Sequence, residues 1–420
     1  MTTRFLIILL SFTTCLHAQQ NDTIYLLTAD RVFDGEQMHE GWSIAIKSNL
    51  ITYIGPGDAH IKSPLKILNY PGCTLLPGLI EGHSHLFLHP YNEVSWNDQV
   101  LKESRAERVA RATVHARKTL LAGFTTVRDL GTEGAGYDDV GLKTAIEKRI
   151  IPGPRMLVAT RAIVATGSYG PKELSYDIES AHGAAEADGK DALIKEIRTQ
   201  IGKGADVVKL YADYGWGIDK ENKPTFTQEE LTTAVEVASS SGRMVVVHAS
   251  TPEGMRRAIA AGVTTIEHGN AGTLELFQMM KSKGIAFCPT LAAVDAIAQY
   301  RGWKKNLEPE PLSVINKRKS FAYALQAGVT ICMGGDVGVF AHGDNAREME
   351  MMVEYGMQPI DVLRSATVIN ATLFGIDAKV GRLKPGLLAD VIAVEGDPSK
   401  NIHNIRNLKM VMKDGLLYLY

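Results

Sequence analysis

The pair His83 and His85 is the first feature of the sequence that could carry out chemistry. The two histidines follow a short apolar run, residues 74–80, which is typical of a buried strand. Side chains of an extended segment alternate between its two faces, so residues two apart point the same way. Both imidazoles can therefore reach one metal ion, and we interpret them as candidate metal ligands.

Other polar residues lie inside or at the end of further short apolar runs. They are Lys209, His248, His268 and Asp336. One such residue means little, but several strand-like runs that carry His, Lys or Asp indicate a shared site. In a (β/α)8 barrel, catalytic residues gather at the carboxyl ends of the strands. We therefore expect these side chains to meet there.

Strand-like and helix-like segments alternate between residues 77 and 380, as expected for parallel βα units. The predicted strands centre near Ile80, Thr126, Leu157, Val208, Val246, Thr265, Ala286 and Ile331. Helix starts are also marked, because Thr227 and Glu230 have the spacing of a capping box. Pro252 after Thr251 is a second start signal. Eight such units predict an α/β protein with a (β/α)8, or TIM, barrel over residues 77–380.

The two ends of the chain have a different pattern. Residues 22–76 and 381–420 contain short strand-like runs separated by turns, and Asp414-Gly415 is typical of a hairpin turn. Neither end has enough apolar residues for a core of its own. We expect both ends to form one small composite β-sandwich domain.

Together these motifs resemble the amidohydrolase superfamily of metal-dependent hydrolases. Within it, the chain is similar to the imidazolonepropionase-like and prolidase-like dipeptidase branch. The resemblance covers about residues 24–418, and the segments 77–85 and 381–390 carry it most clearly. It implies a TIM-barrel enzyme that hydrolyses carbon–nitrogen bonds.

The resemblance also implies two divalent metal ions, expected to be zinc. His83 and His85 would bind the more buried ion, and His248 and His268 the second. Relatives with two metals use a carboxylated lysine where Lys209 lies. A buried lysine whose amine becomes neutral can take up carbon dioxide, and the resulting carbamate can bridge two cations. The alternative is a structural lysine that reaches a surface carboxylate.

Asp336 follows Gly334 and Gly335 and should lie beside a water that bridges the two metals. Two metals lower the pKa of such a water and polarise the scissile carbonyl. Asp336 would take a proton from the attacking hydroxide and give it to the leaving amine. A helix-capping aspartate is the alternative. Glu267, next to His268, is expected to point towards the helices and to have a structural role.

The substrate-binding wall is less clearly marked. Tyr169 and Tyr211 are candidates to donate a hydrogen bond to an oxyanion or a substrate carboxylate, and His342 is a further candidate for substrate contact or proton transfer. Arg128 and Arg161 could pair with a substrate carboxylate or with structural acids. Some dipeptidase relatives carry a histidine where Tyr169 lies, so their specificity does not transfer directly.

These interpretations predict a secreted binuclear amidohydrolase that cleaves a non-cyclic amide, either in a dipeptide or in an N-acyl amino acid. One alternative is a mononuclear hydrolase of cyclic amides or amidines, such as an imidazolonepropionase or a deaminase. Those relatives generally lack the lysine, and many deaminases carry a glutamate where Thr251 stands. A non-catalytic binding barrel is another alternative, but it would have lost a ligand, and no expected ligand is missing.

The N-terminus indicates export. Residues 1–18 have the pattern of a signal peptide: Arg4 precedes an apolar run, and Ala18 precedes a plausible cleavage point. We expect a secreted or periplasmic protein. Thr13 and Thr14 before Cys15 do not form a lipidation signal, so no lipoprotein is expected.

Composition narrows the range of partners. A net charge of −2 gives no basic footprint for nucleic acid. No apolar run reaches the 18 or so residues of a membrane-spanning helix, so no stable membrane insertion is expected after signal removal. The expected partner is a small amide or dipeptide substrate. A homo-oligomer is compatible with the sequence.

Overall fold

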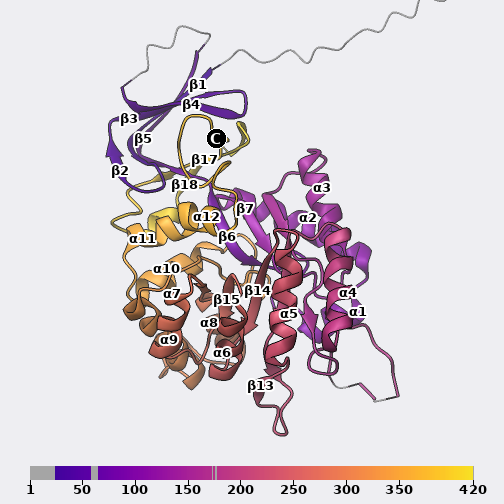
Figure 1. The fold of residues 1–420 in the computed structure, drawn as a ribbon. Coiled ribbons are helices and arrows are strands. Elements are labelled where there is room, and N and C mark those ends of the chain that lie inside the picture. Colours follow the sequence, from indigo (N-terminus) through magenta and orange to yellow (C-terminus); the bar gives the residue numbers. More distant parts are fainter. Residues whose placement is uncertain (1–23, 58–64, 173, 176, 420) are drawn as a thin grey trace, which may run out of the picture.

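The computed structural model describes residues 24–57, 65–172, 174–175 and 177–419. The predicted signal peptide lies outside these residues. A terminal β-sheet lies at one end of the molecule, next to a larger unit of strands surrounded by helices (Figure 1). Within the described residues, no helix is both long enough and apolar enough to cross a membrane.

The larger unit is the predicted barrel of parallel strands. Its strands are β6 (Leu79–Ser84), β7 (Phe124–Asp129), β8 (Arg155–Val158), β11 (Val207–Tyr211), β14 (Met244–Ala249), β15 (Thr265–His268) and β16 (Ala286–Cys288). The eighth stave is an extended segment around Ile331, which pairs with Phe287 through a parallel bridge. The eight staves include all eight predicted strand centres, so the predicted TIM-barrel fold is confirmed.

Two sets of contacts close the barrel where regular pairing is short. Between β8 and β11, the Asp206 amide donates to the Val158 carbonyl over 2.8 Å. Between the last stave and β6, the Gly82 amide donates to the Met333 carbonyl over 3.0 Å, and Ser84 pairs with Val337. The first and last staves are therefore neighbours, although about 250 residues separate them in the sequence.

Helices cover the outside of the barrel. They are α1 (Trp96–Lys102), α2 (Arg105–Leu121), α3 (Asp138–Glu147), α4 (Gly189–Gly202), α5 (Gln228–Ser239), α6 (Pro252–Ala261), α7 (Leu274–Ser282), α8 (Leu291–Tyr300), α9 (Leu312–Ala327), α10 (Ala346–Glu354), α11 (Pro359–Arg364) and α12 (Asn370–Leu373). The predicted capping box at Thr227 and Glu230 begins α5, and Thr251 caps α6 with Pro252 in its first turn. Both caps satisfy amide groups that would otherwise lack partners.

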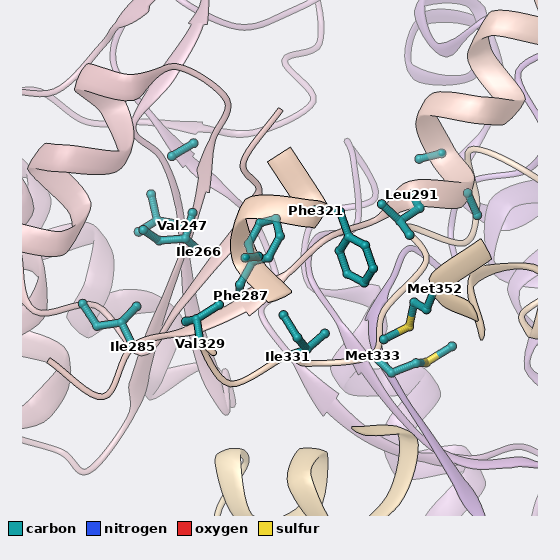
Figure 2. Close-up of a cluster of buried hydrophobic side chains, with 14 of the residues drawn as sticks. Val247, Ile266, Ile285, Phe287, Leu291, Phe321, Val329, Ile331, Met333 and Met352 are labelled. Atoms are coloured by element: carbon teal, nitrogen blue, oxygen red, sulfur yellow. The ribbon is translucent and has the colours of Figure 1, made fainter. Parts of the chain in front are cut away.

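Outward-facing strand residues pack against these helices. Figure 2 shows Val247 of β14 and Ile266 of β15 in one apolar cluster with Phe287, Leu291 and other buried side chains. Because side chains alternate along a strand, an outward Val247 leaves its neighbours facing the barrel interior. This packing turns His248 inward.

The terminal sheet contains strands from both ends of the chain. They are β1 (Ile24–Phe33), β2 (Met38–Glu40), β3 (Trp42–Lys47), β4 (Leu50–Pro56), β5 (Leu65–Pro77), β17 (Val391–Glu395), β18 (Leu408–Lys413) and β19 (Leu416–Leu419). β5 joins the two groups, because it pairs with β1 on one side and with β17 on the other.

The two ends of this sheet also pack together. Ile44 and Ile46 of β3 share one apolar cluster with Met410 and Met412 of β18. The Ala389 amide donates to the Asn49 carbonyl over 2.8 Å and joins the same two regions. The expected sandwich is thus one continuous hydrogen-bonded sheet whose halves share a core. Its exact limits as a domain stay a prediction.

Barrel closure leads to a stability prediction at Gly82. A Cβ there would lie 2.5 Å from the Met333 carbonyl oxygen and 2.7 Å from Cys332 Sγ, so the staves would have to separate. We expect Gly82→Ala to lower the free energy of unfolding by about 1–3 kcal/mol. The measurement is urea unfolding followed by circular dichroism.

Gly141 provides the matched control. It lies within α3, and a Cβ there would have no neighbour within 4 Å. Gly141→Ala should be neutral or stabilise the protein by about 0.5–1 kcal/mol, because alanine is the better helix former. Equal unfolding midpoints for the two variants would contradict the closure argument.

Candidate metal centre

The predicted ligands come together at the carboxyl end of the barrel. His83, His85, His248, His268 and Asp336 line one cavity of about 210 Å³. The ring centroids of His83 and His85 are 5.3 Å apart, those of His83 and His268 are 5.0 Å apart, and those of His248 and His268 are 4.4 Å apart. Four imidazoles from three strand ends therefore face a common space.

Asp336 lies among these rings. Its Oδ1 is 3.6 Å from His83 Nε2 and 3.3 Å from His85 Nε2, and its Oδ2 is 4.0 Å from His268 Nδ1. Single ligand atoms of His83, His268 and Asp336 all lie within 4.8 Å of one another, which is close enough to hold a metal ion.

Two of these residues have a backbone conformation that is rare outside glycine. His268 has a φ of 71° and Asp336 a φ of 64°. Such conformations persist only where the surroundings hold them. Lys317 Nζ donates to the His268 carbonyl over 2.5 Å, and the buried Glu81 carboxylate accepts from the Gly335 amide over 2.8 Å. These contacts fix the turns that bring both side chains into the cavity.

Three of the imidazoles have one ring nitrogen already engaged. His83 Nδ1 donates to Glu267 Oε2 over 2.8 Å, and His85 Nδ1 donates to the Gly131 carbonyl over 2.9 Å. His268 Nδ1 lies 2.8 Å from Thr290 Oγ1. Such a contact selects the tautomer and leaves the second nitrogen available as a ligand.

Burial determines the charge of the rings. It lowers the pKa of His83 to about 4 and that of His248 to about 3, so both are neutral near pH 7. Burial acts the same way on His85, but the hydrogen bond and charge of Asp336 outweigh it and raise the His85 pKa to about 9. A metal that binds His85 must therefore displace a proton.

Lys209 is fully buried inside the barrel. Its Nζ has no hydrogen-bond partner among the described residues, and it makes no ion pair with a surface carboxylate there. Burial lowers its pKa, which favours the neutral and nucleophilic amine. This environment suits a lysine that is carboxylated before it binds metal.

The expected direction of the Glu267 side chain is wrong, but its expected structural role is confirmed, because it holds the His83 ring. Its carboxylate points into the barrel, where it accepts from His83 and, over 3.0 Å, from Arg128 Nη2. Ile266 is the residue of β15 that faces the helices. Strict alternation would have turned Glu267 and His268 to opposite faces, but the left-handed backbone at His268 ends that alternation.

Three other candidate residues lie away from the ligand cluster. Arg128 is buried below it and pairs with Glu267, whereas Arg161 donates to the Ala184 carbonyl. His342 stacks on His115 beside a separate cavity of about 250 Å³. None of the three lines the cavity that contains the ligands. A role for His342 in substrate binding stays a prediction.

Tyr169 and Tyr211 do line this cavity, and both contact a residue that the sequence analysis missed. Glu133 accepts from the hydroxyl groups of both tyrosines and from Trp96 Nε1. Glu133 follows β7 in a glycine-containing loop, where no periodic pattern marks it. The one sequence feature that could have identified Glu133 is its place two residues after Gly131, just past the end of a strand.

This chain is similar to known proteins in both sequence and structure. The sequence model of the amidohydrolase family matches residues 74–417 of this chain. Ochratoxinase from Aspergillus niger is 30% identical over 410 residues, which cover 90% of this chain and 82% of that protein.

Solved structures agree with this result. The crystal structure of an Xaa-Pro dipeptidase with bound methionine in the active site has a TM-score of 0.85 and 32% identity, covering 94% of this chain and 100% of that one. The crystal structure of the A. niger ochratoxinase has a TM-score of 0.79 and 27% identity, covering 94% and 96%.

The buried ion pair between Arg128 and Glu267 leads to a second stability prediction. Glu267→Gln leaves the buried Arg128 guanidinium without a carboxylate, so we expect metal-free protein to lose about 3–5 kcal/mol of unfolding free energy. The double variant Arg128→Met, Glu267→Gln carries no unpaired charge and should lose less. Urea unfolding after dialysis against a chelator measures both.

An exposed ion pair is the control. Lys102 and Asp98 form one on α1, with side chains 70% and 41% exposed. Lys102→Met should cost less than about 1 kcal/mol. If Glu267→Gln were as mild as Lys102→Met, the buried pair would not support the centre.

Proposed function

The chain belongs to the amidohydrolase family, and from that premise we propose that it is a binuclear enzyme that hydrolyses a non-cyclic amide bond. Its substrate would be a dipeptide or an N-acyl amino acid. The observation that carries this proposal is the buried Lys209, whose Nζ has no hydrogen-bond partner among the described residues. Its charge acts on His83, His248, His268 and Asp336, so it lies close to the cavity that these residues line. We also propose export from the cytosol, on the pattern of residues 1–18 alone.

The residues fit two metal ions. His83, His85 and Asp336 would hold one ion, His248 and His268 the other, and carboxylated Lys209 would lie between them. Neutral imidazoles and carboxylate oxygens are ligands that zinc accepts, and we propose zinc for that reason. When bound, such ions lower the pKa of coordinated water and polarise a carbonyl group.

Asp336 is the residue suited to proton transfer. Burial would raise its pKa, but the charges that His83 and His85 carry at acidic pH outweigh that effect and lower the pKa to about 2. Asp336 is therefore ionised at neutral pH, which is the state required of a carboxylate that is to take up a proton. Because it lines the cavity, it can then pass that proton to the nitrogen of the leaving amine.

The two alternative functions account for fewer of these residues. In a mononuclear hydrolase of cyclic amides, Lys209 would have no role as a ligand, yet a buried amine without a hydrogen-bond partner is costly. A non-catalytic barrel would have no need of six converging candidate ligands. The likeness to an Xaa-Pro dipeptidase supports a dipeptide substrate.

We expect Lys209→Ala to retain about one metal equivalent where the native protein retains two, because the bridging group is lost. Inductively coupled plasma mass spectrometry after dialysis measures the content. Lys143→Ala is the control, since Lys143 pairs with Asp206 away from the centre and its loss should leave metal content unchanged. Retention of two equivalents by Lys209→Ala would refute the bridging role.

Asp336→Asn keeps the side-chain shape but removes the base. We expect it to keep its metal and to lose about 10²–10⁴-fold in kcat, the usual contribution of a general acid–base group. Steady-state hydrolysis of dipeptides, with metal content measured on the same preparation, checks this. Turnover near the native rate at full metal content would rule out Asp336 as the proton carrier.

A further inference from the structure

One end of the ligand cavity is built from a buried carboxylate and tyrosine rings. Glu133 is only 2% exposed, and it lines the cavity together with Tyr91, Tyr169, Tyr211 and Tyr214. Its Oε2 accepts from Trp96 Nε1 over 2.9 Å and from the Tyr169 hydroxyl. Its Oε1 accepts from the Tyr211 hydroxyl over 3.3 Å.

The direction of these hydrogen bonds limits what the tyrosines can offer a substrate. A phenol has one proton, and an ionised carboxylate can only accept. Tyr169 and Tyr211 each give that proton to Glu133, so towards the cavity their oxygens can only accept. They are therefore unsuited to the expected task of donating to an oxyanion or a substrate carboxylate.

Glu133 also lacks a cation of its own. Among the described residues, no Lys, Arg or His nitrogen forms an ion pair with its carboxylate. Arg108 is near, but its guanidinium donates to the backbone carbonyls of Phe87, Thr132 and Glu133 and does not line the cavity. A carboxylate offers about four acceptor positions, and three are filled, so one remains on Oε1.

The surrounding rings favour a positive charge. Tyr169 meets Tyr211 and Tyr214 edge to face, with ring centroids 4.9 and 4.8 Å apart. The faces of aromatic rings attract cations, most strongly where water is excluded. The carboxylate, the phenol oxygens and the ring faces thus all favour a positively charged group.

This acceptor end lies close to the metal ligands. A Cβ on Gly131 would be 3.3 Å from Glu133 Oε1 and 3.7 Å from His85 Cε1, so these two atoms face the same small space. The α-ammonium nitrogen of a dipeptide is separated from the scissile carbonyl carbon by one atom. A group that close to the scissile bond could reach Glu133 while the carbonyl lies at the ligand cluster.

We propose that Glu133 and the adjacent tyrosines bind a cationic nitrogen of the substrate, namely the free α-ammonium group of a dipeptide. This inference rests on the proposed amide hydrolysis and selects between its two substrate classes, because an N-acyl amino acid has no such cation. Glu133 is then a specificity-determining residue.

A matched pair of substrates tests the proposal. The native enzyme should hydrolyse Ala-Pro with a kcat/KM about 10- to 100-fold above that for N-acetyl-Ala-Pro, the range expected for a hydrogen bond to a charged group. In Glu133→Gln this ratio should fall towards one. A variant that is merely damaged would lose rate on both substrates and keep the ratio. An unchanged ratio in Glu133→Gln overturns the proposal.

Two controls make the result specific. Glu93→Gln removes a carboxylate that is 57% exposed and borders the other cavity, so it should keep the native ratio. N-acetyl-Lys-Pro carries its cation on a side chain only. If its hydrolysis depended on Glu133 and that of Ala-Pro did not, the cationic site would stand but the α-ammonium assignment would be overturned.

A binding measurement separates this inference from the proposed function. Calorimetry with Asp336→Asn, in which turnover is strongly slowed, measures the affinity for Ala-Pro, and adding Glu133→Gln should weaken it about 10- to 100-fold. If the native enzyme cleaved no amide, the proposed function would fail, but this measurement would still be decisive. Equal affinity of the two variants overturns the role of Glu133.

Discussion

The buried contact between Arg128 and Glu267 is the interaction on which the rest of the centre depends. Arg128 Nε donates to the Gly82 carbonyl over 2.7 Å, while its Nη2 binds Glu267, which in turn holds His83. Three strands, β6, β7 and β15, are thereby joined inside the barrel. Burying these charges is costly, and the cost is offset only while each keeps its partner. The orientation of His83 therefore follows from the barrel's own packing.

The ligand cluster also shows how a stable barrel holds locally unfavourable backbone. His268 and Asp336 both adopt left-handed φ values at the point where their strands end. That conformation turns each side chain over the barrel mouth, a position that regular strand alternation would not provide. Lys317, Glu81 and Asn345 hold the turns through buried hydrogen bonds, so the helices outside the barrel contribute directly to the geometry inside it.

The cavity has two chemically different ends. At one end, four imidazoles and Asp336, with the buried amine of Lys209 next to them, form a donor set for metal ions. At the other, Glu133 polarises the tyrosines so that their oxygens accept hydrogen bonds. The order of these features across a short distance would let one end hold a scissile carbonyl while the other recognises a neighbouring positive charge. Substrate choice would then depend on Glu133 in the loop after β7 and on Tyr169 and Tyr211, whereas the metal ligands lie inside other strands or just past their ends.

The sequence by itself determined the barrel and its candidate ligands, because both follow from local patterns. Strand periodicity predicted all eight staves, and polar residues inside them or near their ends gave the candidate ligands His83, His85, Lys209, His248, His268 and Asp336. It did not determine which way Glu267 points, that Glu133 contacts Tyr169 and Tyr211, or that His342 faces another cavity. Each of these depends on contacts between residues far apart in the chain, such as the 139 positions that separate Arg128 from Glu267. Alternation predicts a side-chain direction only within a regular strand, and the direction of a hydrogen bond is set by the partner that folding supplies.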